Sequence, residues 1–188
     1  MRLPGLFVLG LAMFSLTAAS LSAADADKAK KQAEIQKMAQ AALPDFYKAE
    51  PKLKAEVEKA PGYAVFSTFG LSFLIGGSGG KGLVHDNKTR KDTYMHQAQA
   101  SVGVQAGIAD NRTLIVFKNA AAMNRFIESG WDVGAGGGIG GAIEGKGAGG
   151  AAGGGLVSET EVYTLTRTGL QAGFAAAGAK FWKDQDLN

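Results

Sequence analysis

The glycine-rich stretch at residues 131–155 constrains the fold most, because it holds 13 of the chain's 28 glycines. Its residues nevertheless alternate in type. Odd positions carry the apolar side chains of Trp131, Val133, Ala135, Ile139 and Ile143, and even positions carry Asp132, Gly134, Gly136, Gly138 and Gly140. A period of two is typical of a β-strand. We therefore expect two strands joined by a turn near residues 144–150, with one bare face that another element or a ligand approaches closely.

The same stretch contains patterns that fit nucleotide-binding motifs, such as the G-x-G-x-x-G pattern that begins at Gly136. A dinucleotide site also requires a parallel βαβ unit and a downstream acidic residue, and a P-loop requires Ser or Thr where Gly147 stands. Such patterns arise by chance in a segment that is half glycine. We therefore expect no cofactor.

The first 24 residues have the features of a secretory signal peptide. Arg2 gives a minimal charged region, residues 3–16 are apolar, and residues 22–24 are small. We expect cleavage before Asp25, and the alternative is an uncleaved N-terminal anchor. The chain has no cysteine, so disulfides and a lipid-modified cysteine are excluded. These features favour the periplasm or secretion by a bacterial cell.

The expected mature chain, residues 25–188, has the length of one domain. Loss of Arg2 lowers the formal net charge from +3 to +2, which is too small to indicate a nucleic-acid partner. No later segment is apolar enough to cross a membrane.

The pattern along the mature chain predicts an α+β fold. Residues 25–61 are expected to be helical, with a first helix over 25–43 that ends or bends at Pro44, and a second that starts at Pro51. The remainder, residues 62–188, alternates as strands, except for a helix over 120–128. The glycines inside these strands indicate a strongly curled, mostly antiparallel, barrel-like sheet.

The strands themselves are expected from β-branched and aromatic runs between turn residues. A turn or bulge is expected at residues 76–80, and a charged hairpin turn at 86–92. The expected strands are residues 63–69, 71–75, 81–85, 93–98, 100–108, 113–117, 161–167 and 170–182.

Four short motifs, in this order and spacing, resemble the SYLF domain, also called the Ysc84 actin-binding or DUF500 domain. They are Gly62-Tyr63-Ala64-Val65-Phe66, Gly103-Val104-Gln105-Ala106-Gly107, Gly169-Leu170-Gln171-Ala172-Gly173 and Gly178-Ala179-Lys180-Phe181-Trp182. The resemblance covers about residues 33–187. It implies a non-catalytic lipid-binding domain, because eukaryotic members bind phosphoinositides and other anionic membranes. Fungal members also bind actin, which a bacterial periplasm lacks, so what carries over is binding of anionic phospholipid.

Two groups of residues are candidates for such binding. The first helix carries Lys28, Lys30, Lys31 and Lys37 beside an apolar stripe that includes Ile35 and Met38. Lys88, Arg90 and Lys91 lie in the charged hairpin turn and form a second candidate contact. The alternative is that the stripe packs on the sheet and the lysines are merely solvated. Pattern and resemblance together leave these two interpretations level.

Two other classes of function remain as alternatives. The glycine strands could support a structural protein that self-associates. Residues 76–80 fit G-x-S-x-G, but a nucleophile elbow needs a helix after Ser78, where residues 81–85 resemble a strand. We therefore expect no enzyme. His85 and His96, with Asp86 and Asp92 nearby, are weak evidence for a metal site. We expect them to be exposed hairpin residues and expect no metal site.

Overall fold

A computed structural model of the chain describes residues 15–68, 72–73, 77–100, 111–133, 158–166, 169–172 and 179–188. It contains three helices, α1 (Ser15–Ala49), α2 (Lys52–Lys59) and α3 (Ala120–Ser129). The strands are β1 (Gly62–Ser67), β2 (Ser72–Phe73), β3 (Gly77–Asp86), β4 (Asp92–Ala100), β5 (Arg112–Phe117), β6 (Trp131–Val133), β7 (Thr160–Thr166), β8 (Gly169–Ala172) and β9 (Ala179–Lys183).

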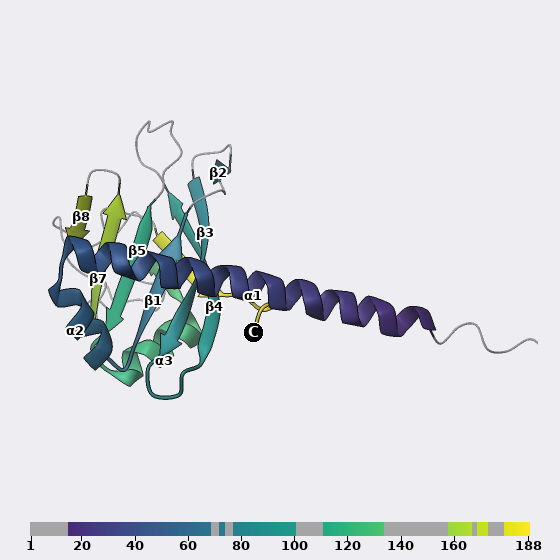
Figure 1. Ribbon diagram of the computed structural model, residues 1–188. Helices are drawn as coiled ribbons and strands as arrows, with labels where there is room; N and C mark the ends of the chain where they lie inside the picture. The colour runs from purple at the N-terminus through teal and green to yellow at the C-terminus, as the bar shows by residue number, and fades with distance from the viewer. Residues whose placement is uncertain are drawn as a thin grey trace, which may run out of the picture.

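The strands form one curled sheet in the order β6-β9-β4-β3-β1-β5-β7-β8, with β2 paired to β3. Every strand pair among the described residues is antiparallel. Helix α1 crosses one face of the sheet, and its N-terminal half continues beyond the sheet edge (Figure 1). The expected α+β fold with a curled antiparallel sheet is therefore confirmed.

Alternate residues of the central strands point to opposite faces, so the sheet carries two hydrophobic cores. On one face, Phe66, Ile115 and Phe117 pack with α3. On the other face, Val65 and Leu114 pack with α1 and α2. A strand buried on both faces has few positions for polar side chains, and this explains the nearly continuous burial of β5.

Helix α1 is longer than its sequence pattern predicts. It continues through Pro44 to Ala49, so of the two expectations for this proline the helix end is wrong, and the bend stays a prediction. Proline removes one helical hydrogen bond and costs about 3 kcal/mol in a helix interior. Burial of Ala42 and Phe46 on either side of Pro44 offsets this cost. The expected signal peptide cleavage site lies inside α1, and the cleavage stays a prediction.

The two shorter helices follow their sequence signals. Helix α2 begins directly after Pro51 and buries Leu53 and Val57. The side chain of Asn119 caps α3 by accepting a hydrogen bond from the backbone N–H of Ala122 at 2.8 Å. Gly130, with φ of 69°, ends α3 in a left-handed conformation that suits glycine.

Three expected strand boundaries are wrong. Gln99, expected to separate the strands over residues 93–98 and 100–108, is a residue of β4 paired with Ser78. Residues 77–80, expected as a turn or bulge, are strand residues of β3 paired with residues 97–100 of β4. The expected single strand over residues 170–182 is two strands, because β8 pairs with β7 while β9 pairs with β4 and β6. Periodicity does not report the strand partner, so it could not separate them.

The glycine-rich stretch enters the sheet at its first residues. Trp131, Asp132 and Val133 form β6 and pair with Phe181, Lys180 and Ala179. The buried Trp131 and the partly exposed Asp132 follow the expected alternation. Gly134, Gly136, Gly138 and Gly140 lie outside the described residues, as do the second expected strand and its turn, so those expectations stay predictions.

Candidate functional site

The hairpin between β3 and β4 has a turn that is built from its own backbone. The Asp86 carboxylate accepts hydrogen bonds from the backbone N–H groups of Lys88 at 2.8 Å and Thr89 at 3.0 Å. The Asp86 carbonyl accepts from the N–H of Arg90 at 2.8 Å. Arg90 adopts a positive φ of 60° to close the turn. The geometry of this turn is therefore set before any ligand arrives.

The hairpin turn is also fixed to the end of α2. The Asn87 side-chain amide donates to the carbonyls of Val57 at 2.7 Å and Ala60 at 2.9 Å. The backbone N–H of Asn87 donates to the carbonyl of Pro61 at 2.9 Å. The two side-chain bonds satisfy carbonyls that α2 leaves free at its C-terminal end.

Lys88, Arg90 and Lys91 project from this fixed turn, and we call them the basic tip. All three are exposed, and none forms an ion pair within the described part of the chain. The neighbouring acid, Asp86, is engaged in the turn, and the hydrogen bond from the Thr89 N–H lowers the pKa of its carboxyl. The tip therefore presents three cations outward.

A histidine and an aspartate lie just behind the basic tip, at a paired position of β3 and β4. His85 Nδ1 lies 2.6 Å from Asp92 Oδ1, and the amide of Gln36 in α1 donates to Asp92 Oδ2 at 2.8 Å. Both Asp92 oxygens are thus engaged. The ring of Tyr63 in β1 lies next to His85, with centroids 5.3 Å apart.

The four candidate lysines of α1 differ in whether they have a hydrogen-bond or ion-pair partner within the chain. Lys28 donates to the carbonyl of Asn188 at 3.0 Å, and Lys31 forms an ion pair with Asp27 at 2.6 Å. Lys30 and Lys37 are exposed and form no ion pair among the described residues. Two of the four lysines thus have partners within the chain.

The apolar stripe of α1 packs on the sheet. Ile35 is 6% exposed and belongs to the core between α1 and the sheet, and Met38 is partly buried against the same core. In this conformation Ile35 is covered and cannot contact an acyl chain. Of the two interpretations of the stripe, the described geometry corresponds to the one in which it packs on the sheet.

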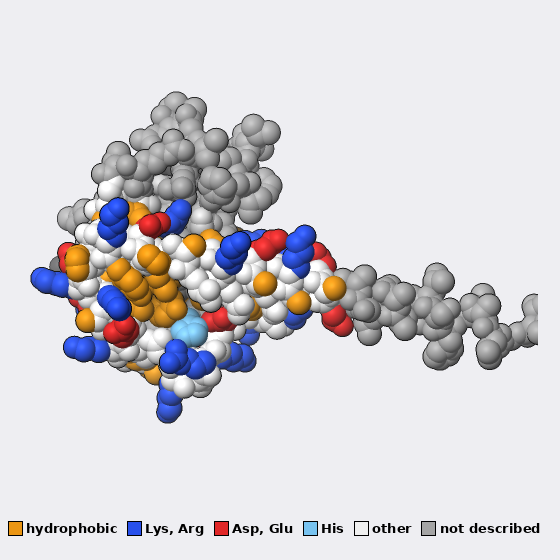
Figure 2. Space-filling view, in the orientation of Figure 1, with side chains coloured by type: hydrophobic (Ala, Val, Ile, Leu, Met, Phe, Trp, Pro, Cys, Tyr) orange, Lys and Arg blue, Asp and Glu red, His pale blue; other side chains and the backbone are white. Residues whose placement is uncertain are grey.

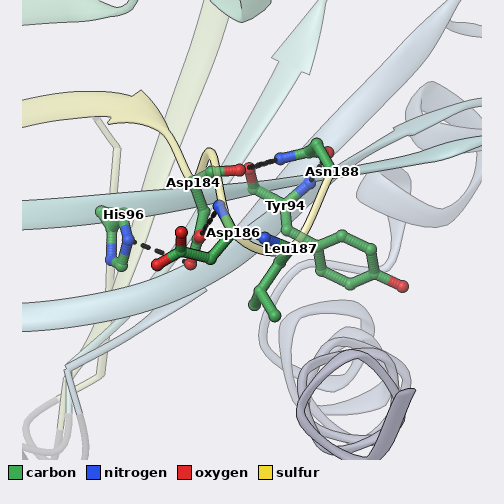
Figure 3. Close-up of polar contacts among 6 residues, drawn as sticks. All are labelled: Tyr94, His96, Asp184, Asp186, Leu187 and Asn188. Carbon is green, nitrogen blue, oxygen red and sulfur yellow. Dashed lines mark hydrogen bonds and ion pairs between the residues drawn. The ribbon is translucent and has the colours of Figure 1, made fainter. Parts of the chain in front are cut away.

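The last five residues, 184–188, join β4 to α1, and we call them the clasp (Figure 3). The Asn188 side chain accepts from the N–H of Tyr94 at 2.9 Å and donates to its carbonyl at 2.8 Å. Asp184 accepts from the N–H groups of residues 186 and 187 and pairs with His96 at 3.0 Å. The amide of Gln32 in α1 donates to the Leu187 carbonyl at 2.7 Å.

The clasp was not predicted from the sequence. The contacts that fix it to β4 and α1 join residues 88 or more positions apart, from His96–Asp184 to Gln32–Leu187, which no local pattern reports. The one local signal is Asp184, because an aspartate that accepts from N–H groups two and three residues later is a common turn.

The residues considered from the sequence for an enzyme or a metal site do not come together in one site. Ser78 lies within β3, where the chain continues as strand to Asp86 and not as a helix. His85 and His96 pair with different aspartates. Among the described residues, no group of three or more His, Cys, Asp or Glu side chains is placed to hold a metal. None of the helices in the described ranges has the length and hydropathy needed to cross a bilayer.

Comparison with known proteins gives one informative similarity. The chain is 29% identical over 162 residues to Beta cell expansion factor A from Aeromonas veronii. The aligned region covers 85% of this chain but 60% of the relative, so the chain spans less than two thirds of that protein's length. No protein-family profile matches the chain. The chain is therefore similar to a bacterial protein whose name specifies no ligand.

Proposed function

We propose that this protein binds anionic phospholipid at a membrane surface, without catalysis, in the bacterial periplasm or outside the cell. The observation that carries the proposal is the basic tip. It offers three exposed cations on a turn whose shape is fixed by hydrogen bonds to its own backbone and to α2. A preorganised site loses less conformational entropy when it binds.

The charge of the tip is large enough for reversible binding. Each Lys or Arg near an anionic surface contributes about 1 kcal/mol, and this contribution decreases as salt screens it. Three cations therefore supply about 3 kcal/mol, and Lys30 and Lys37 of α1 add to the attraction at longer range. Binding of this strength is weak and salt-dependent.

The resemblance to the SYLF domain supports the same class of ligand. Three of its four motifs overlap strands of the sheet, namely β1, β8 and β9. What the resemblance adds is the class of ligand, anionic lipid, and not actin or a phosphoinositide. The compartment follows from the expected signal peptide.

The proposal is tested by charge reversal at the tip. The triple variant Lys88→Glu, Arg90→Glu and Lys91→Glu should lose about 100-fold or more in affinity for phosphatidylglycerol vesicles at low salt, since it loses about 3 kcal/mol of attraction and adds repulsion from three carboxylates. Co-sedimentation with vesicles at low and near-physiological salt measures this. Phosphatidylcholine vesicles should bind weakly to both proteins.

The matched control reverses Lys48, Lys52 and Lys54, which are exposed near the junction of α1 and α2. It makes the same change in net charge away from the tip, and it should lose much less affinity. Equal losses in the two triple variants would show that net charge alone governs binding. Equal binding of the unmodified protein to both kinds of vesicle would contradict the proposal itself.

A further inference from the structure

We infer that a patch of aromatic and apolar side chains beside the basic tip enters the membrane interface when the tip contacts headgroups. This aromatic patch consists of Tyr47, Tyr63, Leu43 and Ala60. All four are partly buried against the core under α1. The inference rests on the proposed function and extends it, because it assigns the apolar contact to these residues and not to the stripe of α1.

The aromatic patch adjoins the basic tip through the register of the sheet. Tyr63 pairs with His85, which immediately precedes the turn residue Asp86. Ala60 accepts a hydrogen bond from Asn87 in the turn itself. Figure 2 shows hydrophobic side chains gathered on the face that α1 crosses, with Lys and Arg side chains around them. The two surfaces can therefore meet one bilayer together.

The tyrosines have the properties of residues that favour a membrane interface. Burial, followed by the neighbouring Tyr63 and Glu58, raises the pKa of Tyr47 to about 12. Burial and then Asp92 also raise the pKa of Tyr63, although Arg90 opposes them. Both hydroxyls are therefore protonated at neutral pH and can donate to phosphate or ester oxygens. The rings remain apolar, and tyrosine is enriched at membrane interfaces for this combination.

The charges around the patch favour an anionic lipid as the occupant. The cations of the basic tip lie at one border. Of the acids nearby, Asp92 is already bonded to His85 and Gln36. Glu58 is exposed and lies close enough to raise the pKa of Tyr47, so its charge opposes binding of an anionic lipid there. The basic tip and the aromatic patch lie side by side, as do the phosphates and the ester and acyl groups of a bilayer. The cations can therefore contact headgroup phosphates while the rings contact the layer beneath them.

The experiment places a tryptophan in the patch and asks whether lipid acyl chains reach it. Trp182, which is 39% exposed, is first changed to Phe. In that background, Tyr63→Trp is compared with Tyr163→Trp. Tyr163 lies on the same face of the sheet, and its hydroxyl lies 3.0 Å from Glu161 and 3.3 Å from Glu56. The buried Trp131 gives the same background signal in both proteins.

Phosphatidylglycerol vesicles with brominated acyl chains should quench the fluorescence of Tyr63→Trp and shift it to shorter wavelength. They should leave Tyr163→Trp unchanged. If both variants bind the vesicles by co-sedimentation but neither is quenched, the aromatic patch is not inserted, while the proposed function stands. If the unmodified protein does not bind the vesicles, both proposals fail.

A second measurement uses the removal of the rings. The double variant Tyr47→Ser and Tyr63→Ser should lose on the order of tenfold in affinity, because the apolar contact area is lost. Its residual binding at high salt should disappear, since apolar contacts resist screening and ionic contacts do not. Tyr163→Ser should keep its affinity. A double variant that binds as well as the unmodified protein at high salt would overturn the inference.

Discussion

At the scale of single residues, close backbone approach explains Gly82. It lies in β3 between Phe66 of β1 and Met95 of β4. A Cβ atom at this position would overlap the Val65 carbonyl oxygen and the ring of Phe66. The sequence pattern predicts such bare backbone at residues 134–140. Among the described residues, Gly82 shows it, and so do Gly62 and Gly80.

We predict that Gly82→Ala lowers the free energy of unfolding by about 1–3 kcal/mol, because neither the strand backbone nor the packed ring can move aside without strain. Urea denaturation followed by circular dichroism measures the change. An unaltered midpoint would mean that β1 and β3 separate more easily than their paired register indicates.

Single residues also show how much of the candidate site could be predicted from the sequence. The basic tip is predictable, since Asp86 and the charged residues after it signal a hairpin turn. The aromatic patch is not, because Tyr47 and Tyr63 come from a helix and a strand whose contact depends on tertiary packing. His85 and Asp92 are visible as residues, but their pairing requires the strand register.

At the scale of elements, α1 shows that tertiary packing can outweigh a local sequence preference. Pro44 disfavours a helix at the residue before it. The helix persists because Ala42 and Phe46 are buried against the sheet and α2. The same limit applies to β8 and β9, since strand propensity reports an extended chain but not its neighbour. Helices α2 and α3, in contrast, begin and end at local sequence signals, and they were predictable nearly to the residue.

We predict that Pro44→Ala stabilises the protein by about 1–3 kcal/mol, because it restores a helical hydrogen bond at an exposed position. The gain is reduced by the greater freedom of the unfolded chain. Thermal unfolding measures it. A lower melting temperature would imply that α1 needs proline at this residue to reach both α2 and the sheet.

At the scale of the whole molecule, the two hydrophobic cores of the described residues lie on opposite faces of one sheet, and different segments of the chain cover them. Helix α3 follows β5 directly in the chain and covers its face locally. The face of the sheet that α1 crosses is covered by segments from both ends of the described chain. These segments are α1 and the clasp, whose Leu187 is buried in the same core. The stability of this face therefore depends on contacts distant in sequence.

We predict that Leu187→Ala costs about 2–5 kcal/mol of unfolding free energy, as is usual for a buried leucine. Amide hydrogen exchange should also become faster in α1 near Gln32, whose side chain bonds to the Leu187 carbonyl. Leu170→Ala is the matched control, since Leu170 is only partly buried at the other side of the same core. Equal losses in the two variants would contradict a special role for the clasp.

The strand order also has a consequence for the curvature of the sheet. β9 is second and β8 is last in the order, so six strand spacings separate them. In a flat sheet this distance would be about 29 Å. The chain between Ala172 and Ala179 has seven Cα-to-Cα steps, which reach about 25 Å when fully extended. A flat sheet with this connectivity could not be joined, so the curl is required by chain length alone, whatever the side chains contribute.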